Sequence, residues 1–95
     1  MKISELTEFD PAEALRDETS IREYLRLAFE DGDPRVVQRA LGTVAKARGM
    51  TALARDTGVK REALYRALSE GGNPEFATIM KVARALGYKL VPQPA

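Results

Sequence analysis

Gly58 interrupts the stretch ALARDTGVKREALYRAL, residues 52–68, which otherwise has the composition of one continuous helix. Glycine readily takes the positive φ that other residues resist, so the pattern predicts a short helix before Gly58 and a second one after it. The small Ala54 permits a close crossing of the two helices, and Val59 holds the second one at a steep angle. The stretch therefore predicts a helix-turn-helix over about 50–69, in which one face of the second helix is free.

The free face of the second helix, expected over about 60–68, carries side chains that suit a DNA major groove. A helical wheel centred on Leu64 points these residues away from the core: Glu62, Arg66 and Ser69, flanked by Tyr65, with Lys60 and Arg61 at the N-terminal end. Arginine can pair with both acceptors of guanine, glutamate can accept from cytosine, and lysine can meet phosphate. We therefore interpret this helix as one that reads DNA. The alternative is a simple surface ion pair between Glu62 and Arg66.

Helix start and stop signals predict three further helices. The first is expected to begin at Ser20, which has a capping-box spacing to Glu23, and to end at Gly32. The second is expected to begin at Asp33, followed by Pro34, and to end at Gly49. The third is expected to begin at Asn73, followed by Pro74, and to end at Gly87. Their apolar stripes are expected to face the core: Ile21, Leu25, Ala28 and Phe29; Val37, Ala40, Leu41, Val44 and Ala45; Phe76, Ile79, Met80, Ala83 and Leu86. Thr51 is expected to cap the first helix of the helix-turn-helix.

The two ends of the chain differ from this helical pattern. Residues 1–19 carry no strong hydrophobic period and are expected to be an N-terminal arm. The tail YKLV, residues 88–91, alternates in character and is closed by Pro92, which predicts a short C-terminal β-strand. The expected fold is thus all-α, with about five helices around a central helix-turn-helix, in a single helical domain over 20–95.

The composition excludes most enzyme chemistry. The chain has no cysteine and no histidine, and therefore no disulfide, no thiolate nucleophile and none of the usual zinc ligands. Its carboxylates show no metal-type spacing, and there is no glycine-rich phosphate loop. We expect a protein that is not an enzyme and that needs no cofactor and no metal. No apolar run approaches the roughly 20 residues that span a bilayer, and no secretory signal opens the chain, so a cytoplasmic protein without a membrane partner is expected.

The charged residues are segregated along the chain. Residues 1–33 carry ten acidic and four basic side chains, whereas residues 34–95 carry four acidic and eleven basic ones. This asymmetry predicts a basic face for a polyanion and an acidic face for a basic partner, although solvated charge is the usual explanation for any one residue. Among the basic residues, we interpret the following as solvated, with a share of phosphate contact for Arg55: Arg35, Arg39, Arg55, Lys81 and Arg84.

These stretches resemble a known family. Residues 50–87 are similar to the helix-turn-helix of the phage-repressor or XRE type. The succession FEDGDP, RGMTALARDTG, REALYRALSEGGNPEF and ALGYKL looks like the HigA-like addiction-module antidotes, which are antitoxins that partner toxins of the RelE superfamily. The resemblance implies a five-helix fold, dimeric operator binding, repression of the module's own promoter, and neutralisation of a small endoribonuclease toxin.

The resemblance also assigns roles to individual positions. It implies base contacts at Arg61, Glu62 and Arg66, phosphate contacts at Lys60 and around Asn73, and a backbone contact near Thr51. Two positions depart from the XRE pattern. The usual Thr-Gln opening is missing at Thr51, and Lys60 stands where a serine or threonine normally caps the recognition helix, so either this cap is lost or the helix begins differently.

Two further surfaces are predicted from apolar and acidic residues. The apolar residues at the C-terminal end are expected to hold a homodimer: Leu86, Tyr88, Leu90 and Val91. A toxin that cuts RNA needs a basic groove, so the toxin-facing surface is expected in the acidic third of the chain: Leu6, Phe9, Asp10, Leu15, Asp17, Glu18 and Glu23. A solubilising arm without a partner is the alternative for this segment.

Together these observations predict a dimeric, sequence-specific DNA-binding antitoxin. It would bind a double-stranded DNA operator and a small basic toxin of the RelE/HigB type. The first alternative is a stand-alone XRE-type repressor without a toxin, and the second is a helical protein-interaction adaptor whose basic helix binds an acidic protein.

Overall fold

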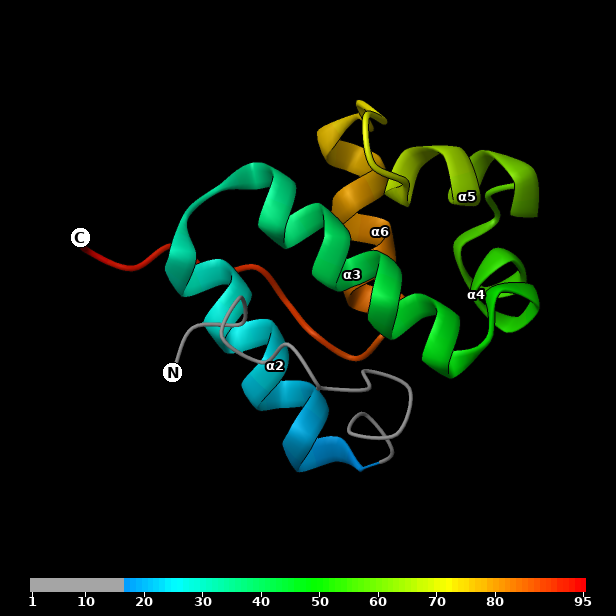
Figure 1. Cartoon of the computed structure of the whole chain (residues 1–95). Helices are drawn as coiled ribbons and strands as arrows, with labels where there is room; N and C mark the ends of the chain where they lie inside the picture. The colour runs from blue at the N-terminus through cyan, green and yellow to red at the C-terminus, as the bar shows by residue number, and fades with distance from the viewer. Residues whose placement is uncertain (1–16) are drawn as a thin grey trace.

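The computed structural model describes residues 17–95, which form helices joined by turns and loops (Figure 1). Five helices lie in this part of the chain: α2 (Glu18–Asp31), α3 (Pro34–Arg48), α4 (Met50–Thr57), α5 (Arg61–Leu68) and α6 (Phe76–Ala85). The expected all-helical architecture is thus confirmed for the described residues. None of these helices is long and apolar enough to cross a membrane.

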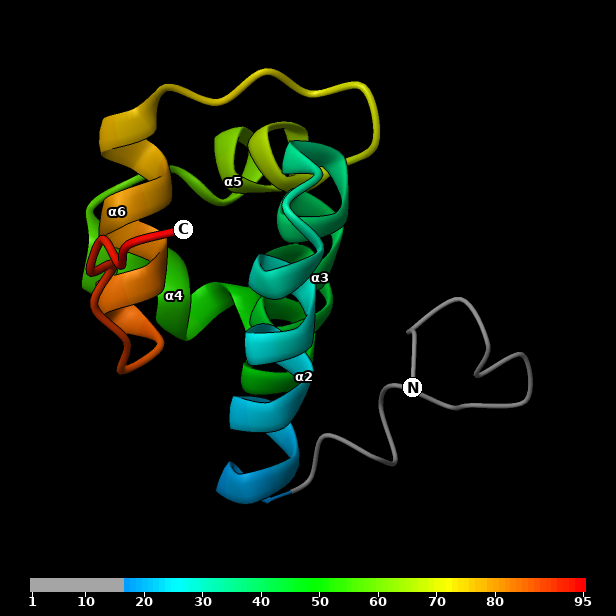
Figure 2. The same ribbon diagram turned by 90° about the vertical axis from the view of Figure 1, so that its left-hand side faces the viewer.

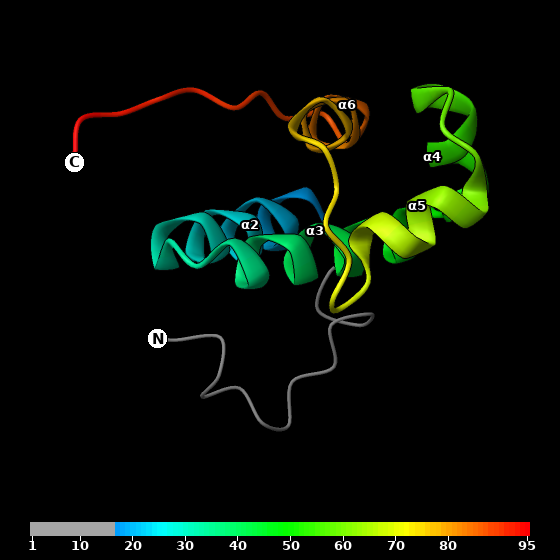
Figure 3. The ribbon, with the colours of Figure 1, turned by 90° about the horizontal axis from the view of Figure 1, so that it is seen from above.

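Helix α3 occupies the centre of the fold. It packs against α2 and also against α4, α5 and α6. Figures 1 and 3 show α2 on one side of the molecule and the α4–α5 pair on the other. The loop that follows α5 crosses one end of the molecule to reach α6 (Figure 2). The central position of α3 makes its apolar stripe the main surface on which the other helices are assembled.

The core consists mainly of aliphatic side chains and includes residues of all five helices. Leu41 and Val44 of α3, Leu64 of α5 and Val82 of α6 are its largest fully buried side chains. The stripe expected on α3 is confirmed, because Ala40, Leu41, Val44 and Ala45 are buried and Val37 packs against them. Burial of each leucine or valine side chain of this kind stabilises the fold by about 1.5–3 kcal/mol. Helix α5 is held on the core through Leu64.

The stripe expected on α6 is partly wrong. Phe76 is 69% exposed and Met80 is 41% exposed, whereas Val82 is fully buried. Helix α6 begins at Phe76, so this ring sits on the first turn and beyond the edge of the core. Of the expected stripe, Ala83 and Leu86 are buried and Ile79 packs against the core, and Val82, which was not expected in the stripe, is fully buried. Phe29, expected in the core stripe of α2, is likewise 40% exposed.

Glycine and aspartate signals located several helix ends correctly. Asp33 caps α3, and its Oδ1 atom accepts a hydrogen bond of 2.9 Å from the Arg35 amide. Pro34 is the first residue of this helix, as its fixed φ favours. Gly32 and Gly58 end α2 and α4 in the left-handed conformation. These predictions succeeded because the signals act within a few residues of the helix end.

Three predicted helix starts are wrong. Helix α2 is capped by Asp17 and not by Ser20, because the Asp17 carboxylate accepts a 2.7 Å hydrogen bond from the Ser20 amide and so moves the start three residues earlier. Helix α4 begins at Met50 after Gly49, so Thr51 lies inside it. Helix α6 has Glu75 as its N-cap residue, and Asn73 belongs to the preceding loop.

The predicted strand over 88–91 is also wrong, since no strand occurs among residues 17–95. The Tyr88 amide donates to the Ala83 carbonyl at 2.9 Å, and Gly87 has a φ of 97°. This is the pattern of a Schellman C-cap, so the start of the tail completes the end of α6. Tyr88 packs against the core, and the tail then leaves α6 towards the side on which α2 lies (Figure 3).

Candidate nucleic-acid interface

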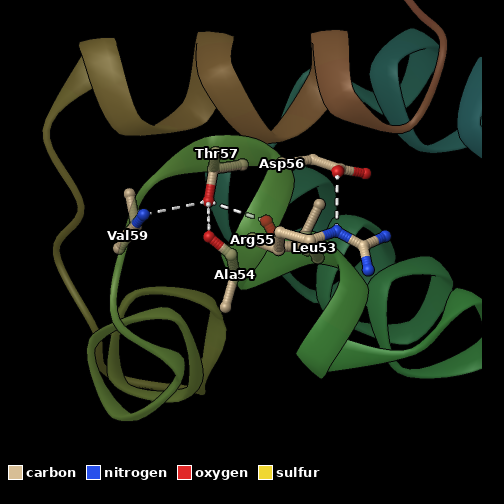
Figure 4. Close-up of polar contacts among 6 residues, drawn as sticks. All are labelled: Leu53, Ala54, Arg55, Asp56, Thr57 and Val59. Carbon is tan, nitrogen blue, oxygen red and sulfur yellow. Dashed lines mark hydrogen bonds and ion pairs between the residues drawn. The ribbon is translucent and has the colours of Figure 1, made fainter.

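The turn between α4 and α5 is fixed by Thr57 and Gly58. The Thr57 hydroxyl donates to the Leu53 carbonyl at 2.8 Å and accepts from the Val59 amide at 3.2 Å (Figure 4). The Gly58 amide donates to the Ala54 carbonyl at 2.9 Å, and its φ of 74° reverses the chain. The Thr57 side chain thereby joins the end of α4 to Val59, the second residue of the turn. The sequence indicated the glycine but gave no hint of the threonine.

Helix α5 presents one face to the core and the opposite face to solvent. Leu64 is fully buried and Leu68 is 7% exposed. Every residue predicted to read DNA from this helix and its ends is exposed: Lys60, Arg61, Glu62, Tyr65, Arg66 and Ser69. The geometry therefore places these six side chains together on the solvent side of one short helix.

The start of α5 has no side-chain cap. Lys60 is the N-cap residue and makes no capping hydrogen bond. Of the two possibilities at this position, a lost cap or a helix that begins differently, the structure therefore has the lost cap. The first amide groups of an α-helix have no intrahelical acceptor, and the helix dipole adds a partial positive charge at this end. The start of α5 therefore offers amide donors beside the basic side chains of Lys60 and Arg61, a combination that favours an anion.

Arg61 is held in place by two residues. Its Nη1 atom donates to the Thr51 hydroxyl at 3.3 Å, and its Nη2 atom lies 3.5 Å from the Tyr65 hydroxyl. The guanidinium also lies over the Tyr65 ring, 5.6 Å from its centre. The hydrogen bond to Tyr65 raises the pKa of Arg61. Thr51 thus supports an arginine of α5 from α4, a role that the sequence did not reveal.

Glu62 and Arg66 form no ion pair with each other in the part of the chain that the structure describes. The simple surface ion pair is therefore not supported as an explanation of their spacing. Ser69 ends the helix, and its hydroxyl donates to the Arg66 carbonyl at 2.9 Å. The side chains of Glu62 and Arg66 remain available to a ligand.

Gln38 of α3 fixes the loop that follows α5. Its Nε2 atom lies within hydrogen-bond distance of three carbonyl oxygens, at 2.8 Å from Ala67, 2.9 Å from Ser69 and 2.9 Å from Gly72. Asn73 is exposed in this loop beside Gly72. The loop is therefore positioned by a residue more than 29 positions earlier in the chain, which no local sequence signal indicated.

Comparison with known proteins adds a decisive observation. A family described as "probable addiction module antidote protein" matches residues 5–94 of the chain. The chain belongs to this family. A protein of Haemophilus influenzae described as uncharacterized is 46% identical over 85 residues, which cover 90% of this chain and 88% of that protein. No solved structure matches the chain. Membership of the antidote family supports an antitoxin role and implies a toxin partner of some kind.

In this antidote the residues expected at a dimer contact lie in different environments. Leu86 is only 4% exposed and belongs to the core of the single chain, which leaves little of its side chain for a dimer contact. Tyr88 and Leu90 are partly buried, and Val91 is 67% exposed. Leu86 closes the end of α6 against the other helices. Among the described residues, the exposed large apolar side chains are Phe29, Tyr65, Phe76, Met80 and Val91.

The residues expected to face the toxin divide into two groups. Leu6, Phe9, Asp10 and Leu15 lie outside the described residues. Within them, Asp17 caps α2, Glu18 pairs with Arg48, and Glu23 pairs with Arg26 at 2.6 Å. The hydrogen bond from the Ser20 amide lowers the pKa of Asp17, and that from Arg26 lowers the pKa of Glu23. Each of these three carboxylates therefore has a structural role in the antidote itself.

Proposed function

We propose that this member of the antidote family is a homodimeric antitoxin that binds a DNA operator through α5. In this proposal α4, the turn at Gly58 and α5 are an XRE-type helix-turn-helix. The antitoxin neutralises a small basic toxin of the RelE/HigB type and represses its own promoter. It acts in the cytoplasm, without enzymatic activity of its own and without a cofactor.

The observation that carries the proposal is the exposed face of α5. Arg61 is oriented by Thr51 and Tyr65, and Arg66 lies on the same solvent side of the helix. An arginine fixed in one orientation can make the two parallel hydrogen bonds that recognise guanine in the major groove. The same face includes Glu62, whose carboxylate suits the amino group of cytosine. Leu64 keeps the opposite face on the core.

We infer a homodimer because the face of α5 that would contact bases is small. Helix α5 has eight residues, and a single module of this kind contacts too few bases for tight specificity. Two copies on half-sites about one helical turn apart double the number of contacts.

The toxin partner is supported by the family and by the charge distribution. The excess of acidic residues in 1–33 suits a protein whose own ligand is an RNA backbone. A stand-alone repressor would have no use for this segment beyond solubility. An adaptor that binds an acidic protein through α5 would differ in having no preference among DNA sequences.

One experiment tests the two halves of the proposal together. The chain is co-expressed with the product of the neighbouring gene, and the purified material is titrated onto a duplex of its own promoter and onto a scrambled duplex of equal length. We expect a stable complex with a small basic protein and tighter binding to the promoter than to the scrambled duplex. Promoter binding without a protein partner would support the stand-alone repressor. Binding to neither duplex would support the adaptor.

A further inference from the structure

A basic groove lies between α3 and the end of α5, outside the DNA-reading face of α5. It has a volume of about 290 Å³. Three of the residues that line it are cations of α3, namely Arg35, Arg39 and Lys46, and all three are exposed. Ser69 lines the groove from the other side and also ends the exposed face of α5. The groove is therefore continuous with the surface that we propose reads DNA.

The walls of the groove are packed tightly together. Gly42 of α3 approaches Leu68 so closely that a Cβ atom at this position would lie 2.8 Å from the Leu68 carbonyl oxygen. Gln38 holds the chain around Ser69 from the same helix. A side chain at position 42 would push α5 away from α3. The spacing between the cations and the end of α5 is thus set by the packing of the fold.

The charges in the groove are arranged for an anion. Arg39 and Lys46 make no ion pair among residues 17–95, and Arg35 reaches Asp33 only at 3.5 Å. Glu70 is the one carboxylate in the lining of this groove. The C-terminal end of α5 would ordinarily repel an anion through its unpaired carbonyls. Here the Gln38 amide donates to two of these carbonyls, at Ala67 and Ser69, which reduces that repulsion.

The spacing of the cations indicates an extended ligand. Arg35 and Arg39 are one helical turn apart, and Lys46 lies seven residues beyond Arg39. At 1.5 Å per residue the three positions span about 16 Å along α3. A single small anion does not need cations over such a length, whereas a nucleic-acid backbone presents a row of phosphates. A basic toxin would be repelled by the same charges.

We propose that the α3 groove binds the DNA sugar-phosphate backbone that borders the major groove read by α5, with Arg39 and Lys46 as its principal phosphate contacts. This inference rests on the proposed DNA-binding function and adds a second contact surface to it. Phosphate contacts of this kind set the orientation of a protein on DNA without selecting a sequence. The groove therefore contributes affinity and register, and α5 contributes specificity.

The test uses the full chain with both cations removed, as Arg39→Ala/Lys46→Ala. The probes are the duplex of the chain's own promoter and a scrambled duplex of equal length, each titrated over a range of salt concentrations. We expect the affinity for both duplexes to fall by the same factor, on the order of tenfold or more. The slope of the logarithm of affinity against the logarithm of salt concentration should become less steep by about 2, because two phosphate contacts are lost. The ratio of the two affinities should stay unchanged.

A matched control removes the same charge elsewhere. Lys81→Ala/Arg84→Ala takes two exposed cations from α6, neither of which lines the groove. This variant should keep the salt slope of the original chain. Arg39→Gln/Lys46→Gln repeats the groove test with longer side chains, so that a folding defect in the alanine variant can be recognised by its thermal unfolding curve. Both groove variants should behave alike on DNA.

The outcomes separate this inference from the proposed function. If the original chain binds its promoter and the groove variants keep the salt slope of the control variant, the groove assignment is wrong while the role of α5 stands. If the groove variants bind DNA normally but no longer retain a protein partner in co-purification, the groove is a protein site and the inference is overturned. If the original chain binds neither duplex, both proposals fail.

Discussion

The guanidinium of Arg61 lies over the ring of Tyr65, 5.6 Å from its centre, and one of its nitrogens lies 3.5 Å from the hydroxyl of the same residue. The two residues are four positions apart, so they are neighbours on one face of α5. Thr51 accepts a third contact from the other guanidinium nitrogen. A long and flexible side chain is thereby oriented before any ligand arrives. We infer that Tyr65 acts on DNA recognition through Arg61.

The first prediction concerns this positioning role. Tyr65→Phe keeps the ring and removes the hydroxyl, whereas Tyr65→Ala removes both. We expect Tyr65→Phe to weaken promoter binding by roughly twofold and Tyr65→Ala by roughly fivefold, in keeping with cation–π and hydrogen-bond contributions at exposed sites. The check is a double-mutant cycle with Arg61→Ala. If Tyr65→Ala weakens binding as much in the Arg61→Ala background as in the original chain, Tyr65 acts independently of the arginine.

The second prediction separates base contacts from phosphate contacts on α5. Arg61→Ala and Arg66→Ala should each weaken promoter binding by roughly 10- to 100-fold and relax the preference at one base position. Lys60→Ala should weaken binding to promoter and scrambled duplexes alike, because a phosphate contact carries no sequence information. Titration of all three variants on both duplexes is the measurement. If both arginine variants still discriminate between the promoter and the scrambled duplex as the original chain does, α5 does not read bases in the DNA major groove.

The third prediction concerns the amide of Gln38. Gln38→Leu removes the amide nitrogen that lies within hydrogen-bond distance of three carbonyls, at Ala67, Ser69 and Gly72. We expect a loss of about 1–3 kcal/mol in the free energy of unfolding, which lowers Tm by roughly 5–15 °C in a domain of this size. Gln93→Leu is the matched control, since Gln93 is exposed in the tail. Equal Tm values for the two variants would show that the Gln38 contacts contribute nothing to stability.

Local signals explain why much of this fold is predictable from the sequence. The turn at Gly58, the cap at Asp33 and the buried stripe around Leu41 depend on a few neighbouring residues or on the helical period. The same holds for the exposed face of α5, because burial of Leu64 determines which of its neighbours face solvent. Predictions of this kind need only the sequence within about two helical turns.

The errors arise where residues compete or where distant segments meet. Asp17 and Ser20 both suit a cap for α2, and the periodicity does not decide between them, but the carboxylate makes the bond in the structure. The tail alternates like a strand, yet Tyr88 is used to cap α6 and to cover the core. Gln38 reaches the loop after α5 across 29 or more positions. No local pattern contains such information.

The fourth prediction concerns the dependence of stability on pH. The hydrogen bond from the Ser20 amide lowers the pKa of Asp17, and that from the Arg35 amide lowers the pKa of Asp33. A lowered folded-state pKa means that the stabilisation is present above the ordinary carboxyl range and is lost as the pH falls through the lowered value. We therefore expect Tm to decrease on acidification below about pH 4.

The variant Asp17→Asn tests the source of this dependence. Asparagine caps a helix about as well as aspartate but carries no charge. The Tm of this variant should therefore decrease less between pH 5 and pH 2.5 than the Tm of the original chain. Asp31→Asn is the control, because Asp31 is exposed at the end of α2 and caps no helix. If Asp17→Asn and Asp31→Asn show the same acid dependence, the cap is not responsible for it.

The last prediction concerns the toxin-facing surface. Asp17, Glu18 and Glu23 have structural roles within α2, and the rest of the predicted toxin-facing surface lies in residues 1–16, outside the described part of the chain. This segment includes Leu6, Phe9, Asp10 and Leu15, which combine apolar anchors with negative charge. Apolar anchors supply affinity, while exposed charge mainly raises the association rate. A chain that lacks residues 1–16 keeps Asp17 as the cap of α2, so it should keep its DNA binding but bind the partner toxin far more weakly, on the order of a hundredfold.

The variant Glu18→Gln/Glu23→Gln in the full chain is the control and should bind the toxin nearly as well as the original chain. Isothermal titration with the co-purified toxin measures all three affinities. Equal affinities for the full and shortened chains would place the toxin on another surface, and a large loss in the control alone would place it on α2.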